Sequence, residues 1–335
     1  MNDKRQYVII SPCRNEAAYI RRTLDSVTKQ TVPPALWIIV DDGSTDETPE
    51  ILADYASRFV FIKIVRRSDR GARSVGPGVI QAFYDGYEQI DVPYDYICKL
   101  DTDLVMPPAY FEQLMKMMEV DPRLGTVSGK TFYIDKHSGQ HVPEQIRDHM
   151  SIGASKFYRR ECFEQIGGFV REVMWDGIDC HRARMFGWKA CSVADPNLGF
   201  EHLRPMGSSD QNILKGRKRH GYGQYFMGSS FAFVTASAIF RIPSPPRVIG
   251  SIMMWWGYVD AMLRRKPRYD DPKFVQFLRR WQWLSLFKGT QQATAQVTEE
   301  RKRIWNPPSA SNCPAPHLLN SERQVADRVN SSARD

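Results

Sequence analysis

Short apolar runs alternate with amphipathic stretches along the first hundred residues of the chain. Near-continuous runs rich in Ile and Val occupy residues 7–11, 37–42, 61–67 and 96–101. Between them, apolar side chains recur at helical spacing over 20–27 and 79–90, and a further helix is indicated after Asp46, with Pro49 early in it. Apolar strands that alternate with helices form parallel sheets covered on both faces. The pattern therefore predicts an α/β fold with a mainly parallel, Rossmann-like sheet and helices on both faces.

The pattern loosens after residue 103. The remaining elements are expected as a helix over 108–120, a strand over 126–133, a strand–helix unit over 155–169, and a helix from Trp175 to Gly187. Two apolar segments, 226–242 and 248–263, follow. This organisation predicts an α/β domain at 1–205, a helical extension at 206–290 and a polar, disordered tail at 291–335.

Polar motifs end three of the first four expected strands. They are SPCRNE (11–16), DDGSTD (41–46) and DTD (101–103). Taken singly, each has an ordinary explanation, because Asn15 and either Thr45 or Asp46 are placed to cap helices. Together they meet at the edge of the sheet where ligands bind, since the carboxyl ends of parallel strands lie side by side. Carboxylates there suit hydrogen bonding to a ribose and base, or a divalent cation that holds a diphosphate.

Asp101 and Asp103 raise an electrostatic question. Side chains two residues apart in a strand point to the same face, so these carboxylates would repel each other. A divalent metal, Mg²⁺ or Mn²⁺, bound between one of them and phosphate oxygens would remove that repulsion. The sequence therefore predicts a metal site at this strand end, with a polar loop as the plainer alternative.

The motifs in combination resemble glycosyltransferase family 2, of the GT-A fold. The segment from about residue 205 to about residue 290 is similar in outline only to the bacterial cell-surface polysaccharide members of that family. The segments that carry the resemblance are PCRNE (12–16), VDDGSTD (40–46), the glycine loop (70–78) and KLDTD (99–103). The resemblance runs from about residue 7 to about residue 205. It implies an inverting enzyme that takes its sugar from a nucleotide-diphosphate donor.

The resemblance also assigns roles to individual residues. It implies that the donor is bound by residues of the three strand ends and the glycine loop: Pro12, Asn15, Glu16, Asp41, Asp42, Arg70, Arg73, Asp101 and Thr102. It implies that Asp103 and His202 bind the metal. The glycine loop reads DRGARSVG, which departs from the Asn and Arg usual in the family.

A further segment, WDGIDCHRARMFGW (175–188), resembles the part of the family that carries the catalytic base. In the register set by Arg182 and Gly187, Asp176 takes the place of the base. The position suits that role, because a helix N-terminus favours an ionised carboxylate, and transfer requires a base for the acceptor hydroxyl. A helix cap without chemistry is the alternative. The candidates for the acceptor side are Gly168, Trp175 and Asp179.

Charge and cysteine content narrow the possible partners and location. The formal net charge is +8, and residues 204–280 alone hold 14 Lys or Arg and four Asp or Glu. This local excess predicts an anionic partner. The six cysteines are scattered without paired spacing, which is typical of reduced thiols, and no secretory segment opens the chain. We therefore expect a cytoplasmic protein.

The segment 248–263 indicates a membrane surface as that partner. Twelve of its sixteen residues are apolar, fewer than the roughly 20 that a spanning helix needs. Trp255 and Trp256 lie inside it, and Arg or Lys residues flank it, which is typical of a helix lying in the membrane interface. We expect a peripheral position at the inner face of the cell membrane. A buried helix pair is the alternative, and nothing indicates binding to nucleic acid.

The interpretation that these observations favour is sugar transfer to a hydroxyl of an acceptor, a saccharide or lipid-linked saccharide in polysaccharide synthesis. Two other classes stay open. One is a non-enzymatic protein of the same fold that binds nucleotide sugars. The other is a sugar nucleotidyltransferase, which normally has a glycine-rich triphosphate loop after its first strand, where this chain has SPCRNE.

Overall fold

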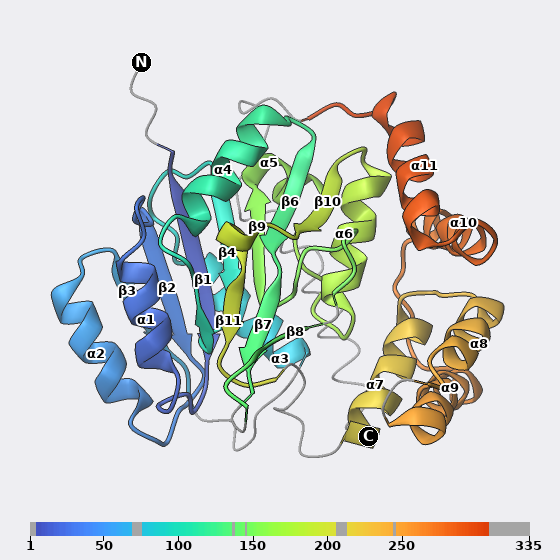
Figure 1. The fold of residues 1–335 in the computed structure, drawn as a ribbon, viewed down its shortest axis with the longest axis horizontal. Coiled ribbons are helices and arrows are strands. Elements are labelled where there is room, and N and C mark those ends of the chain that lie inside the picture. Colours follow the sequence, from blue (N-terminus) through green and yellow to red (C-terminus); the bar gives the residue numbers. More distant parts are fainter. Residues whose placement is uncertain are drawn as a thin grey trace.

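The structure is a computed structural model that describes residues 5–68, 76–135, 138–144, 146–205, 213–243 and 246–307. Its centre is a seven-stranded sheet in the order β10-β6-β9-β4-β1-β2-β3 (Figure 1). The strands are β1 (Tyr7–Cys13), β2 (Leu36–Asp41), β3 (Ile62–Arg66), β4 (Tyr96–Leu100), β6 (Leu124–Gly129), β9 (Ser155–Arg159) and β10 (Lys189–Val193). Only β9 runs antiparallel to its neighbours in this sheet. The expected mainly parallel sheet is confirmed.

Helices cover both faces of this sheet because its central strands are apolar on both sides. Tyr7 and Ile9 of β1 pack in one core, with residues of α1 (Ile20–Thr28), α2 (Thr48–Arg58) and α4 (Tyr110–Val120). Val8 and Ile10 pack in the other, with residues of α3 (Pro77–Tyr87), α5 (Arg160–Gln165) and α6 (Trp175–Met185). Successive residues of a strand point to opposite faces, so one strand serves both cores.

A second, four-stranded sheet lies at the carboxyl edge of the first. It has the order β5-β11-β7-β8, with β5 (Leu104–Val105), β7 (Thr131–Ile134), β8 (His141–Pro143) and β11 (Phe200–His202). The single strand expected over 126–133 is therefore two strands in different sheets. The break follows Gly129, where a Cβ atom would lie 1.8 Å from the carbonyl oxygen of Leu198 in the 3-10 turn η1 (Pro196–Leu198).

Among the described residues, five helices follow β11 and lie to one side of the α/β domain, beyond α6 (Figure 1). They are α7 (Ile213–Phe226), α8 (Phe231–Phe240), α9 (Arg247–Leu263), α10 (Pro272–Lys288) and α11 (Thr290–Lys302). Phe274, Leu278 and Trp281 of α10 form a core with Ile178 of α6. In the described part of the chain, no helix combines the length and apolar character needed to cross a bilayer.

The expectation of a disordered tail is wrong for its first residues. The helix α11 packs Ala293 and Val297, one turn apart, into the core formed with α6 and α10. Arg123 donates to the carbonyl oxygen of Thr298 at 2.7 Å and ties the helix to the α/β domain. Residues 308–335 lie outside the described residues.

Candidate active site

Asn15 ties together the loops that follow β1 and β2. Its backbone N–H donates to Ser44 Oγ at 2.9 Å, and its side-chain Oδ1 accepts from the backbone N–H of Thr45 at 2.8 Å. Its φ of 51° lies in the left-handed region, which asparagine adopts more readily than most residues. Asn15 is not a helix cap, because α1 begins at Ile20 directly after Tyr19. That part of the sequence interpretation is wrong.

Asp41 and Asp42, at the end of β2, are both buried and have different partners. Asp41 Oδ1 accepts from the backbone N–H of Ser44 at 2.9 Å and so shapes the turn. Asp42 Oδ1 accepts from Arg67 Nη1 at 2.7 Å, and Arg67 also pairs with Asp85 at 2.7 Å. Asp42 therefore stands beside a fixed guanidinium at the edge of the sheet.

The carboxylates of Asp101 and Asp103 follow β4, which ends at Leu100. The alternation of a strand therefore does not decide where they point. Asp101 Oδ1 accepts from Lys99 Nζ, whereas Asp103 is 4% exposed and has other partners. Thr102 between them is buried. The repulsion that the sequence suggested is compensated in part by this protein's own cations.

Asp103, His202 and Glu144 form a row at the second sheet, since Asp103 precedes β5, His202 ends β11 and Glu144 follows β8. The pairing of β11 with β5 sets His202 opposite Leu104, beside Asp103. His202 Nε2 lies 3.5 Å from Asp103 Oδ2, and its Nδ1 lies 3.1 Å from Glu144 Oε2. Burial disfavours the imidazolium, but the hydrogen bonds to Asp103 and Glu144 outweigh it and raise the pKa of His202 to about 9.

Arg204 is a functional candidate that the sequence interpretation missed. Its Nε donates to Asp103 Oδ2 and its Nη2 to Glu16 Oε1, both at 2.6 Å. Its guanidinium also lies 5.2 Å from the centre of the Tyr19 ring. One cation thus joins the first and fourth strand ends. The available signal was its place two residues after His202, which puts it next to the same edge.

The residues at Asp103 fit a divalent metal. A metal-binding histidine usually donates its second ring N–H to a carboxylate, and Glu144 is placed to accept that hydrogen bond from His202 Nδ1. His202 Nε2 then faces Asp103. Among the described residues, no group of three or more His, Cys, Asp or Glu side chains forms a ready metal cage. Mg²⁺ and Mn²⁺ sites at phosphates commonly use one or two carboxylates, with phosphate oxygens and water as the other ligands.

Asp176 lies in the first turn of α6 and is half-buried. A Cβ atom on Gly153 would lie 3.0 Å from Asp176 Oδ2, so Gly153 leaves room for this carboxylate. Lys99 Nζ donates both to Asp101 and, at 2.9 Å, to the carbonyl oxygen of Gly153. The proposed base and the acids after β4 therefore belong to one connected site.

The acceptor-side candidates are placed less favourably. Asp179 is 1% exposed, and its carboxylate accepts from Lys156 and Tyr158 in the core, so it cannot reach an acceptor without unfolding of α6. Trp175 is also buried and packs edge-to-face on Phe169 at 4.9 Å between ring centres.

Gly168 was expected to let an acceptor approach closely. Its φ is +70°, and a Cβ atom would lie 2.4 Å from the hydroxyl of Tyr84, which donates to the carbonyl oxygen of Phe169 at 2.8 Å. The space beside Gly168 is thus filled by the protein's own side chain. Pro12 is half-buried in β1, opposite Val40.

Two donor-side candidates cannot be placed. Arg70 and Arg73 lie outside the described residues. The geometry assembled here therefore rests on the three strand ends, β8, β11 and the start of α6.

Comparison with known proteins assigns the first half of the chain to a family. The model of glycosyl transferase family 2 matches residues 8–175. Glycosyltransferase AglE of Haloferax volcanii is 27% identical over 235 residues, 64% of this chain and 72% of that protein. Poly-beta-1,6-N-acetyl-D-glucosamine synthase of Staphylococcus epidermidis is 30% identical over 127 residues, 38% of this chain and 28% of that protein. Putative glycosyltransferase EpsH of Bacillus subtilis is 30% identical over 164 residues, 49% of this chain and 44% of that protein.

Two solved structures align with most of this chain. The mannosyltransferase PcManGT from Pyrobaculum calidifontis, solved with GDP-Man and Mn²⁺, aligns at 18% identity and a TM-score of 0.47 over 89% of this chain and 87% of that one. Residues 1–349 of TarS from S. aureus, solved with UDP, align at 13% identity and a TM-score of 0.48 over 90% of each chain.

Proposed function

The chain belongs to glycosyltransferase family 2, and from this premise we propose that it transfers a sugar, with inversion, from a nucleoside-diphosphate donor to a hydroxyl of a lipid-linked saccharide in cell-surface polysaccharide synthesis. It is a glycosyltransferase, class EC 2.4, with a nucleotide sugar as donor. The observation that carries the finer proposal is the link from Asp101 through Lys99 and Gly153 to the half-buried carboxylate of Asp176. The pair Asp103 and His202, which fits a metal, begins two residues after Asp101.

The donor would lie across the carboxyl ends of β1, β2 and β4. Asp42, fixed by Arg67, is suited to hydrogen-bond the base, and Glu16 beside Arg204 is suited to lie by the nucleoside. The other residues that we assign to the donor are Pro12, Asn15, Asp41, Arg70, Arg73, Asp101 and Thr102. Asp103 and His202 would hold the divalent cation, which would supply positive charge to the leaving diphosphate.

Asp176 would accept the proton of the acceptor hydroxyl. That oxygen attacks the anomeric carbon as the bond from this carbon to the diphosphate breaks, so a single displacement inverts the configuration. The N-terminus of α6 favours the ionised carboxylate that a base requires. Because Asp176 is only half-buried, an acceptor can reach it, whereas the fully buried Asp179 is a structural partner of Lys156.

The acceptor class rests on the relatives and on the extension. The relative from Staphylococcus epidermidis is a poly-beta-1,6-N-acetyl-D-glucosamine synthase, and EpsH is a putative glycosyltransferase. This chain spans less than half the length of each, so a polysaccharide-type acceptor is a proposal for this chain. Exposed large apolar side chains gather between residues 231 and 263: Phe231, Ile239, Phe240, Ile242, Val248, Ile249, Ile252, Trp256, Met262 and Leu263. Large apolar side chains exposed in this number on two packed helices are typical of a membrane or protein contact.

We therefore propose that α8 and α9 rest on the inner, anionic face of the cell membrane. The alternative of a buried helix pair accounts for one face of α9 only. Gly250, Met254 and Tyr258 are buried, whereas Ile252 and Trp256 are 57% and 44% exposed. A lipid-linked acceptor would lie at the same surface.

Hydrolysis of nucleotide sugars separates this function from the alternatives. Purified protein is incubated with Mn²⁺ and each of the UDP, GDP, dTDP and CMP sugars, and free nucleotide is measured. We expect turnover with one donor that EDTA and Asp103→Ala both abolish. Binding without turnover would favour a non-enzymatic protein. Release of pyrophosphate from a nucleoside triphosphate and a sugar phosphate would favour a nucleotidyltransferase.

A further inference from the structure

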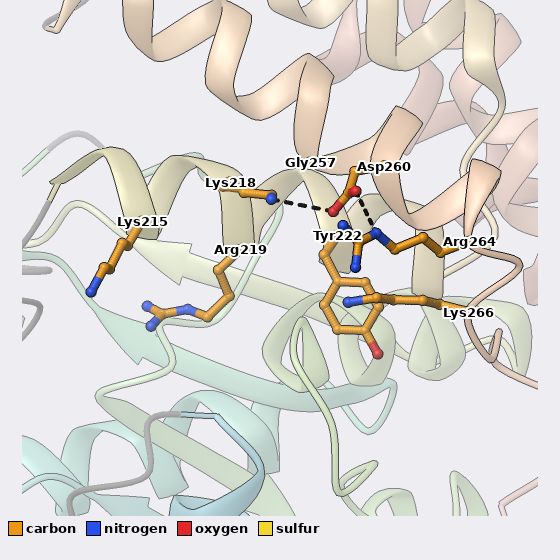
Figure 2. Close-up of a pocket in the computed structure, with 8 residues that line it drawn as sticks. All are labelled: Lys215, Lys218, Arg219, Tyr222, Gly257, Asp260, Arg264 and Lys266. Carbon is orange, nitrogen blue, oxygen red and sulfur yellow. Dashed lines mark hydrogen bonds and ion pairs between the residues drawn. The ribbon is translucent and has the colours of Figure 1, made fainter. Parts of the chain in front are cut away.

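A basic groove opens between α7 and the C-terminal half of α9 (Figure 2). Its cavity volume is about 380 Å³. The residues that line it are Lys215, Lys218, Arg219, Tyr222, Gly257, Asp260, Arg264 and Lys266. We call this site the basic groove.

The charges of the basic groove do not balance. Five of its lining side chains are cationic and one, Asp260, is anionic. Asp260 binds Lys218 at 3.2 Å and Arg264 at 2.7 Å. Lys215 points away from Asp260 in Figure 2, and Lys266 Nζ lies 4.8 Å from the centre of the Tyr222 ring. A concave surface lined by charge of one sign concentrates ligands of the other sign, so the groove favours an anion.

The backbone holds these cations together. A Cβ atom on Gly257 would lie 2.1 Å from the carbonyl oxygen of Lys218, and one on Gly221 would lie 1.8 Å from that of Met254. Glycine at both points lets α7 and α9 cross in direct backbone contact. The backbone positions that carry the cations of α7 and of the end of α9 are thereby held around one cavity before any ligand arrives, and a preorganised site binds at a lower entropy cost.

The basic groove adjoins an apolar face of the same helix. Ile252, Trp256 and Leu263 are exposed along α9, and Trp256 precedes Asp260 of the groove by one helical turn. Residues four apart on a helix are surface neighbours, so the charged and apolar faces meet along one edge. An anionic head attached to a lipid chain matches both faces, whereas a soluble anion matches the groove alone.

The opposite wall of the groove leads toward Asp176. The hydroxyl of Tyr222 donates to Glu172 Oε2 at 3.4 Å, and a Cβ atom on Gly223 would lie 2.3 Å from Met174, two residues before Asp176. The helix α7, which forms one wall of the groove, therefore packs against the segment that leads into Asp176.

We propose that the basic groove binds the phosphate or diphosphate of the lipid-borne acceptor, with the lipid chain along the exposed face of α9 and the sugar directed toward Asp176. The proposal rests on the proposed function and adds to it a binding site for the charged part of the acceptor. Lys215 and Lys266 supply the charge that meets the phosphate. Lys218 and Arg264 share theirs with Asp260.

The test uses farnesyl diphosphate, a short lipid diphosphate, as the probe for isothermal titration calorimetry on the full chain. Lys215→Gln/Lys266→Gln removes two groove cations. Lys273→Gln/Lys288→Gln removes two cations of α10 outside the groove and serves as the matched control. With about fivefold in affinity for each phosphate-facing cation, we expect roughly 25-fold weaker binding for the groove variant and no change for the control. Asp260→Asn, which adds net positive charge, is expected to strengthen binding.

Parallel titrations identify the part of the ligand that is bound. We expect inorganic pyrophosphate to bind more weakly than farnesyl diphosphate and farnesol hardly at all. Equal affinity for pyrophosphate would overturn the lipid part of the proposal. If phosphatidylglycerol vesicles compete with farnesyl diphosphate equally well, the groove binds bulk membrane lipid rather than the acceptor, and the proposal is overturned as well. If the control variant binds farnesyl diphosphate as weakly as the groove variant, the binding depends on general surface charge and not on the groove.

Nucleotide-sugar hydrolysis by the same variants keeps this proposal separate from the proposed function. We expect hydrolysis in the absence of acceptor to be unchanged by the groove substitutions. If the groove variant loses farnesyl diphosphate binding but keeps hydrolysis, the result supports the groove as a separate binding site and leaves the active-site assignment unchanged. Intact binding in a chain that never turns over a donor would leave a lipid-phosphate site and refute the transferase mechanism.

Discussion

Substitution of Arg204 by methionine tests the electrostatics of the candidate active site. Arg204 is the shared partner of Glu16 and Asp103, which are 2% and 4% exposed, and its own side chain is 19% exposed. Removing one partner of a buried ion pair costs about 3–5 kcal/mol, because the remaining charges stay buried. At roughly 2–4 °C per kcal/mol for a domain of about 200 residues, Arg204→Met should lower Tm by roughly 6–20 °C without metal.

The assay is thermal unfolding of the purified protein, with EDTA and with Mn²⁺. A ligand that binds only the folded state raises Tm according to its affinity. In the wild type, Arg204 Nε occupies Asp103 Oδ2, the carboxylate oxygen nearest to His202. Without that competitor, Mn²⁺ should bind Asp103 more tightly, so we expect a larger metal-induced rise in Tm for Arg204→Met than for the wild type.

Arg22→Met is the matched control. Arg22 also pairs with a glutamate, Glu201, at 2.7 Å, but its side chain is 56% exposed. Exposed pairs contribute about 0.2–1 kcal/mol, so the control should change Tm little. A Tm of Arg204→Met equal to that of the control without metal, or an equal response of both to Mn²⁺, would refute the assignment of Arg204 and of the metal position beside it.

Two further predictions concern the core and the membrane face. Asp179→Asn leaves the ammonium of Lys156 buried without its anionic partner, so the free energy of unfolding should fall by about 3–5 kcal/mol in denaturant titrations. An unchanged stability, together with a raised KM for the acceptor, would instead return Asp179 to the acceptor side. Trp256→Ser should reduce flotation with phosphatidylglycerol vesicles at low salt by roughly tenfold or more, since one large apolar side chain contributes about 1.5–3 kcal/mol when buried. Val60→Ser, at a fully exposed site in the α/β domain, is the control, and equal flotation of the two variants would count against a membrane contact of α9.

The parts of the fold that follow from local pattern were predictable. The apolar runs before Cys13, Asp41 and Asp101 form parallel strands, and the motifs after them meet at one edge because parallel strands end together. Asp176 was also placed correctly in the first turn of a helix, since Trp175 begins α6 and Gly187, with a φ of +90°, follows its end.

Contacts between segments far apart in the sequence were not predictable in the same way. Arg204 and Glu144 reach Asp103 and His202 through the second sheet, whose strands are two to four residues long. Strands of that length leave hardly any periodic signal. The pairing of β11 with β5 depends on tertiary structure rather than on either segment alone.

Burial separated residues that the sequence treats alike. Asp176 and Asp179 are both acids near the start of one helix, three residues apart. Asp176 is half-buried, whereas Asp179 is buried beside Lys156 of β9. The helix α11 buries only Ala293 and Val297, one turn apart. Two apolar positions are too short a pattern to predict a packed helix in a segment that is otherwise polar.

Turnover by Asp176→Asn tests the central claim most directly. The substitution keeps the size and shape of the side chain but removes its ability to accept a proton. With the donor identified by hydrolysis and Mn²⁺ present, we expect kcat to fall by about 10²–10⁴, the usual range for loss of a general base, while KM for the donor stays unchanged. Near-full kcat in Asp176→Asn, with the fold intact by circular dichroism, would contradict the assignment of Asp176 as the base and the mechanism built on it.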